Sequence, residues 1–457
     1  MQENRALAEV PPAENFDMSL TKHEYFHGLL PREDVASLLK KDGDFLVRLS
    51  EADTQGTKLE MVLSVLHDPK SRYKGEPTEN REDSIIHIII QYAKKKYFAV
   101  SNPGFNSVPE LISYYLKHTM IFKSQQVRLK QAIYFASWEF QPEDVTLENV
   151  VAKFGCGEVR KGKVTRMDLP TLTVAIKTVF GRSLEAREKI CELMRECRLL
   201  RELNHPCIIQ YYGVCLLAQP HCFLFEYVSG GPLSIYLRNN KRNIKRDDLL
   251  MMVSCAGWGL EYLHKNTILH RDIAAKNCLY DKQFVKLIGF SMSKKATVYS
   301  MKTARRLAIR WMAPETIETF QYSQKSDVYG YGILIYEIFS AKEPYEGLSN
   351  WDAKPLIIDG NVNDFTGNTP KKLSEVVRDK MWARDVDSRS SMHQIMLWMQ
   401  VYTGMELQIF NAGDMATATI RQNADALVTK DIELQHLPNF KEPLPKTPQR
   451  KKKKKKD

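Results

Sequence analysis

A lysine and a glutamate are spaced so that a strand and a helix could bring them together as an ion pair. Lys177 ends the apolar run 172–177, which has the composition of a buried strand. Glu196 follows nineteen residues later, in a segment whose apolar residues repeat at helical spacing. These are Ile190, Leu193, Met194, Cys197 and Leu200. A lysine in such a buried setting needs an anionic partner, and we expect Glu196 to be that partner.

The segment 270–277 reads His-Arg-Asp-Ile-Ala-Ala-Lys-Asn and carries a carboxylate and an amide. Together with the Val-Ala-Ile-Lys sequence that ends at Lys177, it resembles the catalytic machinery of a protein kinase. The resemblance implies that Asp272 accepts the proton of the substrate hydroxyl and that Asn277 holds magnesium. It also implies that Lys177, positioned by Glu196, contacts the α and β phosphates of ATP. The Ala-Ala-Lys before Asn277 is similar to the Ala-Ala-Arg of tyrosine kinases.

Two parts of the kinase pattern are altered. Gly289-Phe290-Ser291 stands where the pattern has Asp-Phe-Gly, so the carboxylate that bridges magnesium to the β and γ phosphates is missing. The glycine-rich loop is altered too, because Ala152 and Phe154 stand at its first two glycines. We therefore expect metal and phosphate handling to be impaired, with a rate lower by about 10²- to 10³-fold or more. The alternative is that Ser291 or a water replaces the ligand and slow turnover survives.

The remaining nucleotide and regulatory positions follow from the same resemblance. It places Val159, Ala175 and Leu279 against the adenine of ATP, although ordinary core packing explains each of these apolar residues equally well. Tyr299 stands where the family carries its activation-loop phosphotyrosine, and a phosphate there could order the loop through Arg271. An exposed loop tyrosine without a role is the alternative for Tyr299.

A further charged residue, Arg48, interrupts the apolar segment 45–50, which reads Phe-Leu-Val-Arg-Leu-Ser. A strand would point Arg48 inward, where an unpaired guanidinium is costly, so this side chain needs an anion. A structural carboxylate is one candidate for that anion. The other is a bound phosphate, which the planar guanidinium can contact through two hydrogen bonds.

The residues around Arg48 resemble a Src homology 2 domain over nearly the whole of residues 23–130. The resemblance rests on Tyr25-Phe26-His27-Gly28, on Pro31-Arg32 and on the run 86–91, which reads Ile-His-Ile-Ile-Ile-Gln. It implies that Arg48 binds the phosphate of phosphotyrosine, and that Arg32 and Ser50 add donors. It also implies that His87 packs beside the phosphotyrosine ring. Arg32 and His87 could instead have structural roles only.

The elements that position these groups follow from periodicity and turn residues. Strand-like runs over 59–66 and 85–91, with helical patterns after Pro31 and from Ser107, predict an antiparallel sheet between two helices within residues 23–130. Strands followed by mostly helical patterns predict a bilobal kinase fold over 143–403, so the fold class is α+β. We expect a flexible lead over 1–22 and a disordered tail over 404–457 with a polybasic end.

Composition limits the partners and the location. The net charge is +11, but residues 450–457 contribute +6 of it, so we do not expect nucleic acid to be a partner of the body of the chain. Lys451 to Lys456 could associate weakly with anionic membrane lipid or remain solvated. All eight cysteines lie between Cys156 and Cys278 without a close Cys-x-x-Cys pair, which fits a reducing compartment. Neither a secretory signal nor a membrane-spanning run is evident, so we expect a cytoplasmic protein, with some of it on the inner face of the membrane if the lysines bind lipid.

A phosphotyrosine-binding module directly before a tyrosine-type kinase is similar to the Fer/Fes branch of cytoplasmic tyrosine kinases. The long membrane-bending N-terminal region of that branch has no counterpart before residue 23. We therefore do not expect this chain to bind curved membranes as that region does. The resemblance implies transfer of the γ-phosphate of ATP to protein tyrosine, with magnesium as cofactor and tyrosine-phosphorylated proteins or receptors as partners. The competing hypothesis is a catalytically impaired pseudokinase scaffold that binds phosphotyrosine proteins. An adaptor tethered by its lysine run to lipid or nucleic acid is the third.

Overall fold

A computed structural model of the 457-residue chain describes residues 8–9, 16–51, 59–69, 81–166, 170–181, 183–281, 283–302, 307–365, 367–410 and 417–422. Contacts divide the chain into two compact units. The first comprises residues 1–204, 208–229 and 289–291, and the second comprises residues 205–207, 230–288 and 292–457. In the described part of the chain, no helix has the length and apolar character needed to cross a membrane.

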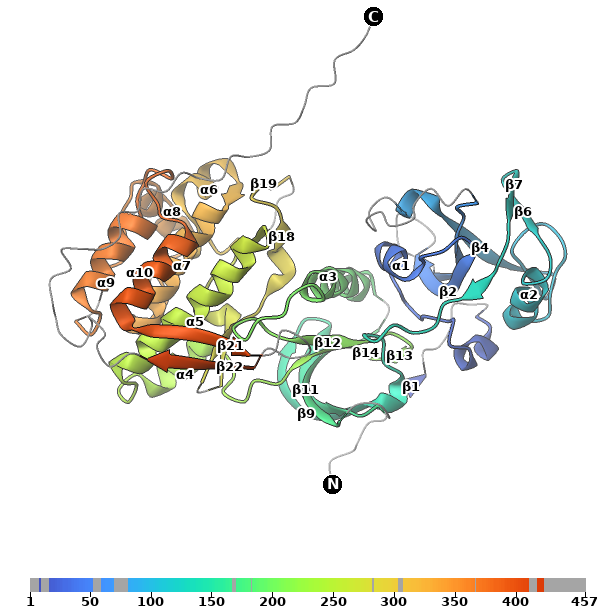
Figure 1. Cartoon of the computed structure of the whole chain (residues 1–457), viewed down its shortest axis with the longest axis horizontal. Helices are drawn as coiled ribbons and strands as arrows, with labels where there is room; N and C mark the ends of the chain where they lie inside the picture. The colour runs from blue at the N-terminus through green and yellow to red at the C-terminus, as the bar shows by residue number, and fades with distance from the viewer. Residues whose placement is uncertain are drawn as a thin grey trace, which may run out of the picture. The chain divides into compact units, whose positions relative to one another are not determined.

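The first unit begins with a five-stranded sheet flanked by two helices. The sheet has the order β5-β4-β3-β2-β8, in which β8 is parallel to β2 and the other neighbours are antiparallel. Helices α1 (Arg32–Leu38) and α2 (Val108–Tyr115) lie on opposite sides of it (Figure 1). The strands are β2 (Asp44–Glu51), β3 (Leu59–Leu66), β4 (Ile85–Ala93), β5 (Lys96–Phe98) and β8 (Gln131–Ala132). The expected antiparallel sheet between two helices is thus confirmed.

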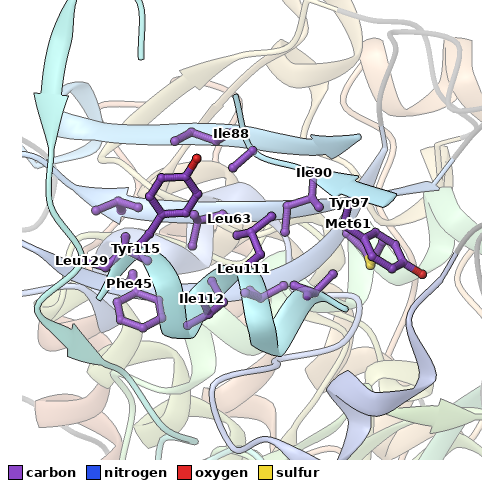
Figure 2. Packing of buried hydrophobic residues seen from close by; sticks show 14 of the residues in the cluster. Phe45, Met61, Leu63, Ile88, Ile90, Tyr97, Leu111, Ile112, Tyr115 and Leu129 are labelled. Carbon is purple, nitrogen blue, oxygen red and sulfur yellow. The ribbon is translucent and has the colours of Figure 1, made fainter. Parts of the chain in front are cut away.

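The core of this module lies between α2 and the sheet, as Figure 2 shows. Leu111 and Ile112 of α2 point toward Leu63 of β3 and Ile88 of β4, and all four side chains are at most 2% exposed. The helix begins where the sequence predicts, because the hydroxyl of Ser107 accepts a hydrogen bond from the backbone N–H three residues on. A short hairpin of β6 (Met120–Phe122) and β7 (Gln125–Val127) follows.

The prediction of a flexible lead over residues 1–22 is wrong for its described end. Residues Met18–Lys22 form a 3₁₀ helix, η1, and Leu20 is fully buried in the core of the module. The carboxylate of Asp17 accepts a hydrogen bond from the backbone N–H of Val108, which ties this segment to the start of α2. Before it, β1 (Ala8–Glu9) pairs with β13 (Ala218–Gln219). A polar segment with one buried leucine gives too little periodicity for its docking to be predicted.

A second five-stranded sheet, of order β12-β14-β11-β10-β9, completes the first unit together with helix α3 (Leu184–Leu200). All of its neighbouring strands are antiparallel. Strands β9 and β10 form a tight hairpin in which Phe154 pairs with Gly157. The strands are β9 (Val145–Phe154), β10 (Gly157–Val164), β11 (Leu172–Val179), β12 (Tyr211–Cys215) and β14 (His221–Glu226).

The second unit is mostly helical, as the sequence predicts. Helices α5, α7 and α10 lie side by side, and almost every residue of α7 is buried (Figure 1). Short antiparallel pairs of strands carry the loops between the helices: β16 with β17, β15 with β18, and β19 with β20. The helices are α4 (Leu233–Asn240), α5 (Arg246–Lys265), α6 (Pro314–Thr319), α7 (Gln324–Ser340), α8 (Asn350–Ile358), α9 (Lys371–Val376) and α10 (Met392–Thr403). The strands are β15 (Ile268–Leu269), β16 (Cys278–Tyr280), β17 (Val285–Leu287), β18 (Lys294–Lys295), β19 (Val298–Ser300) and β20 (Gln321–Ser323).

The prediction of a disordered tail from residue 404 is wrong for its first part. Strands β21 (Met405–Phe410) and β22 (Thr417–Gln422) form an antiparallel hairpin after α10. Met405 is buried and contacts the hydroxyl of Ser254 in α5. The alternation of apolar and polar residues over 405–409 is the strand signal, and it is too short to outweigh the polar composition that surrounds it. Residues 423–457, including the lysine run, lie outside the described residues.

Candidate functional site

Lys177 and Glu196 form the predicted ion pair. The Nζ atom of Lys177, on β11, lies 3.2 and 3.3 Å from the two carboxylate oxygens of Glu196 on α3. Glu196 is buried, whereas the lysine side chain keeps 28% of its surface exposed. The ammonium group also lies 4.6 Å from the ring centre of Phe225, which adds a cation–π contact. The lysine is thus held in one place while part of it faces solvent.

Glu196 is held by a backbone hydrogen bond and by the packing of its helix. The backbone N–H of Phe290 donates to the Oε1 atom of Glu196 at 3.4 Å. One face of α3 is buried, and it includes Ile190, Leu193 and Cys197 as the sequence predicts. The helix begins at a serine cap, because the Ser183 hydroxyl accepts from the backbone N–H three residues on.

The last turn of α3 is attached to the first module. Asp34, whose side chain is fully buried on α1, accepts hydrogen bonds from Arg198 at 3.2 and 2.8 Å. Arg201 forms a second ion pair with the same carboxylate and stacks on Trp138 at 3.9 Å. The helix that presents Glu196 is therefore linked to the module that carries Arg48.

The loop with Asp272 and Asn277 is built as the resemblance implies. The Nδ2 atom of Asn277 donates to the backbone carbonyl of Asp272 at 2.8 Å, so its amide oxygen stays available. Lys276 lies 3.7 Å from Oδ1 of Asp272, and the aspartate side chain is 26% exposed. A cavity of about 140 Å³ lies beside Asp272, and its lining includes Ala308 and Trp311. A hydroxyl-bearing side chain entering this cavity would approach the carboxylate of Asp272.

Asp327 of α7 holds this loop in its conformation. Its carboxylate accepts hydrogen bonds at 2.8 Å from the backbone N–H groups of His270 and Arg271. Arg271 has a φ of 72°, a left-handed conformation that is costly for a residue with a side chain. Burial, partly opposed by the negative potential of nearby tyrosines, lowers the pKa of Arg271. Elsewhere in this unit, Arg389 pairs with Glu315 of α6 at 2.7 and 2.9 Å.

Metal ligands are scarce around this loop. Gly289 has a φ of 82° and brings no carboxylate, which leaves the amide oxygen of Asn277 as the group suited to magnesium. No cluster of three or more acidic, histidine or cysteine side chains with metal-binding geometry occurs among the described residues. Magnesium prefers several oxygen ligands, commonly with at least one carboxylate. The residues present therefore do not fit the two-ligand magnesium site of protein kinases.

The ring of Phe154 packs against the loop between β9 and β10. A side chain at Gly157 would meet the ring of Phe154 at 2.7 Å, so that ring already lies against this glycine. Lys189 of α3 lies 5.6 Å from the centre of the same ring. Gly155 has a φ of only 20°. The ring thus occupies space beside the hairpin that a glycine at position 154 would leave free.

The three expected adenine contacts come from two places in the chain. Val159 pairs with Lys177 across β10 and β11, and Ala175 lies two residues before Lys177 on the same face of the sheet. Both are partly buried. Leu279 lies on β16 in the second unit and is partly buried too. All three are therefore partly accessible, and their contact with adenine stays a prediction.

Arg48 is buried without a carboxylate. Its Nε donates to the Ser64 hydroxyl at 3.2 Å and one terminal nitrogen donates to the carbonyl of Leu30 at 3.0 Å, with only 2% of the residue exposed. Among the residues that the structure describes, no acidic side chain forms an ion pair with it. Burial, followed by the positive charge of Arg32, lowers the pKa of Arg48 to about 10, so the side chain remains charged at neutral pH. A charge in this position is suited to an external anion.

The other residues predicted to bind phosphotyrosine differ in how closely they are connected to Arg48. The Nδ1 atom of His87 lies 2.9 Å from the Ser64 hydroxyl, and burial together with the charges of Arg48 and Arg32 lowers the pKa of His87 to about 3. Arg32 is exposed at the start of α1, and it lines a pocket of about 330 Å³ with His87. Ser50 is partly exposed near the end of β2, and no hydrogen bond places it at Arg48.

Tyr299 lies on β19, directly opposite Tyr322 on β20. It is partly buried, so the alternative of an exposed loop tyrosine does not describe it. Its ring centre lies 4.3 Å from the guanidinium carbon of Arg271 and 5.7 Å from the Nζ atom of Lys294. That a phosphate on Tyr299 orders the loop through Arg271 stays a prediction.

Sequence reasoning missed three contacts of the candidate site residues. Ser64 contacts Arg48 and His87, and its signal is a lone serine inside the apolar strand 59–66. Asp34 has no comparable signal, because an acidic residue in the first turn of a helix is usual. The pairing of Tyr299 with Tyr322 depends on a strand register across twenty-two residues that no local pattern reveals.

Comparison with known proteins places both modules. Residues 145–399 match the family described as protein tyrosine and serine/threonine kinase, and residues 25–115 match the SH2 domain. The chain belongs to the tyrosine kinase family. It is of the Fer/Fes type, in which an SH2 domain precedes the kinase domain.

Relatives of this kinase-family chain are similar along most of its length. It is 31% identical to the spermatocyte protein spe-8 of Caenorhabditis elegans over 78% of the chain and 68% of that protein. It is 32% identical to human tyrosine-protein kinase Fer over 82% of the chain, but only 43% of Fer is covered. For the Fps transforming protein of avian sarcoma virus PRCII, the identity is 32%, with 84% of the chain and 68% of the relative covered.

Proposed function

We propose that this chain is a cytoplasmic signalling protein that binds phosphotyrosine partners at Arg48 and slowly transfers the γ-phosphate of ATP to protein tyrosine. The observation that carries the proposal is the ion pair of Lys177 and Glu196 at 3.2 Å. The lysine ammonium has three donors and its side chain is 28% exposed, so in this proposal it can also bind an anion such as a phosphate.

In the proposed reaction, each of the candidate site residues has its own role. Bound ATP would supply the electrophilic γ-phosphate. Asp272 accepts the proton of the substrate tyrosine hydroxyl and orients that oxygen for attack. Lys177 binds the α and β phosphates, and Glu196 fixes its position. Lys276 lies 3.7 Å from the Oδ1 atom of Asp272 and is the cation beside the proposed base.

Magnesium binding is proposed only in a reduced form, through the amide oxygen of Asn277. A single neutral ligand holds a divalent cation weakly, so the proposal includes a low rate. The specific observation that favours the second candidate, a pseudokinase scaffold, is the combination of Gly289 with the ring of Phe154 against Gly157. In that case the kinase fold would serve as a docking surface for partners captured by Arg48.

A phosphorylation assay separates the two candidates. The full chain is incubated with labelled ATP and a tyrosine-containing copolymer, in magnesium and separately in manganese, beside the Asp272→Asn variant. If the wild type incorporates labelled phosphate into the copolymer and the Asp272→Asn variant does not, the result supports transfer by this chain. Incorporation equal in both proteins, or absent from both, leaves the scaffold as the function.

We further propose that Tyr299 is a phosphorylation site and that Lys451 to Lys456 hold part of the protein on anionic membrane. Tyr299 lies beside two cations, Arg271 and Lys294, which would stabilise a phosphate. Mass spectrometry of the protein after incubation with ATP tests the first proposal. Deletion of residues 450–456 tests the second, since an unchanged distribution between membrane and cytoplasm would contradict it.

A further inference from the structure

Arg271 lies between two tyrosine rings. Its guanidinium carbon is 4.3 Å from the ring centre of Tyr299 and 4.2 Å from that of Tyr322. These two residues face each other across β19 and β20, so their side chains leave the same face of the two-stranded sheet. Each ring presents a π face to the cation, and a partly desolvated guanidinium gains from both contacts.

The backbone of Arg271 cannot easily follow the rings if they move. The left-handed residue is held by Asp327, and its side chain donates to the carbonyl of Met292 at 2.6 Å. Tyr322 is only 3% exposed and belongs to a core cluster with Leu269. Two of the three groups in the stack are therefore fixed by the body of the unit, and Tyr299 is the member that belongs to the segment 293–302.

The start of this segment has its own attachments, because β18 pairs with β15 and the Ser293 hydroxyl donates to the carbonyl of His270 at 3.2 Å. The residues around β19 depend on a different set of contacts. The backbone N–H of Met301 donates to the carbonyl of Phe320 at 3.0 Å, next to the β19–β20 ladder. The neighbouring side chain of Val298 is 53% exposed and contributes little burial. A three-residue strand pair is weak by itself, so the stacking of the Tyr299 ring on Arg271 strengthens the attachment of β19.

We propose that the ring of Tyr299, stacked on Arg271 opposite Tyr322, is an anchor that keeps the part of segment 293–302 around β19 ordered in the absence of phosphate. The ring, and not the hydroxyl, performs this task. A phosphate on Tyr299 is then not required to order the segment, and modification requires the ring to leave Arg271 first. This inference concerns the same residue as the proposed phosphorylation site, and it rests on that assignment only for its regulatory meaning.

Hydrogen exchange of the full chain, treated with a tyrosine phosphatase and checked by intact mass, tests the anchor. Peptides covering residues 293–302 are compared in wild type, Tyr299→Phe and Tyr299→Leu. The phenylalanine variant keeps the π face without the hydroxyl, whereas leucine keeps apolar bulk without the π face. Val298→Ala is the matched control on the same strand, and Tyr322→Leu removes the second ring. Exchange in α5 and α7 reports whether each variant is folded.

Wild type, Tyr299→Phe and Val298→Ala should exchange alike, and Tyr299→Leu and Tyr322→Leu should exchange about 5- to 30-fold faster in this segment. The anchor is refuted if Tyr299→Phe exchanges as fast as Tyr299→Leu, or if Tyr299→Leu matches wild type. It is also refuted if the segment of the dephosphorylated wild type is unprotected and gains protection only after phosphorylation. No catalysis enters this measurement, so failure of the proposed transfer activity in the copolymer assay would leave its outcome unchanged.

Discussion

Restoring a carboxylate at position 289 should raise the rate of phosphate transfer. The substitution Gly289→Asp returns the group that bridges magnesium to the β and γ phosphates in protein kinases. The residues on either side are already held, because Phe290 donates to Glu196 and Ile288 donates to the backbone carbonyl of Asn277 at 2.9 Å. A side chain at this position therefore starts from a fixed backbone.

The expected size of the effect follows from the groups that are present. A metal ligand contributes at least as much as one preorganised electrostatic contact, which is worth about 10²- to 10³-fold in rate, or 3–4 kcal/mol. Against this stands the backbone at Gly289, whose φ of 82° is left-handed. A residue with a side chain costs about 1–2 kcal/mol of folding free energy there, and aspartate is among the side chains that tolerate the conformation best. The substitution should therefore lower the activation free energy by more than it lowers the free energy of unfolding.

The assay is copolymer phosphorylation at saturating ATP and magnesium, with the free energy of unfolding measured alongside. Gly289→Asn is the matched control, because asparagine has the same shape and tolerates the same backbone but brings no charge. Gly289→Asp should exceed both wild type and Gly289→Asn by at least 10²-fold. If Gly289→Asp binds magnesium and ATP more tightly without a faster rate, the missing ligand is not what limits transfer, and the loop around Phe154 becomes the cause.

Three further predictions concern binding and stability. Replacing Arg48 with lysine keeps the charge but removes the planar fork, so binding of a phosphotyrosine peptide should weaken about 30- to 1,000-fold in fluorescence anisotropy, with the unphosphorylated peptide as control. Asp34→Asn leaves Arg198 and Arg201 without their carboxylate, and these arginines are only 32% and 15% exposed. Urea denaturation should therefore show a free energy of unfolding lower by about 1–3 kcal/mol. A change below about 0.5 kcal/mol would contradict a stabilising role of these ion pairs. Burial lowers the pKa of His205 from 6.5 to about 4. As the pH falls, the unfolded chain therefore binds a proton on His205 before the folded chain does. The free energy of unfolding should fall between pH 6.5 and pH 4, by about 3 kcal/mol at most. His205→Asn should make that pH dependence shallower.

The sequence predicts the parts of the site that depend on local patterns. Apolar runs and helical spacing locate the strand of Lys177 and the helix of Glu196, and a charged residue in each makes their pairing predictable. Arg48 is predictable for the same reason, because an arginine within an apolar strand has few physical solutions. The antiparallel sheet between two helices follows from alternation and from the Ser107 cap.

Features that depend on distant partners could not be predicted in this way. Leu20 is a single buried residue in a polar segment, so its docking has no periodic signal, and the hairpin from Met405 is short. Asp34 resembles an ordinary acidic residue at the start of a helix until Arg198 is brought against it by the tertiary fold. The stack of Tyr299 on Arg271 likewise requires the register between two short strands.

The altered positions lead to a last prediction about the proposed transfer reaction. Lys177 and Glu196 form their ion pair, whereas Gly289 and Phe154 replace groups that hold the reacting end of ATP in protein kinases. Transfer depends on placing the reacting atoms to within about 1 Å, so a loosely held γ-phosphate lowers the rate more than it lowers the affinity for nucleotide. Phosphopeptide binding at Arg48 uses none of the altered groups. We therefore expect nucleotide affinity to fall less than turnover, and phosphotyrosine recognition to be retained in full.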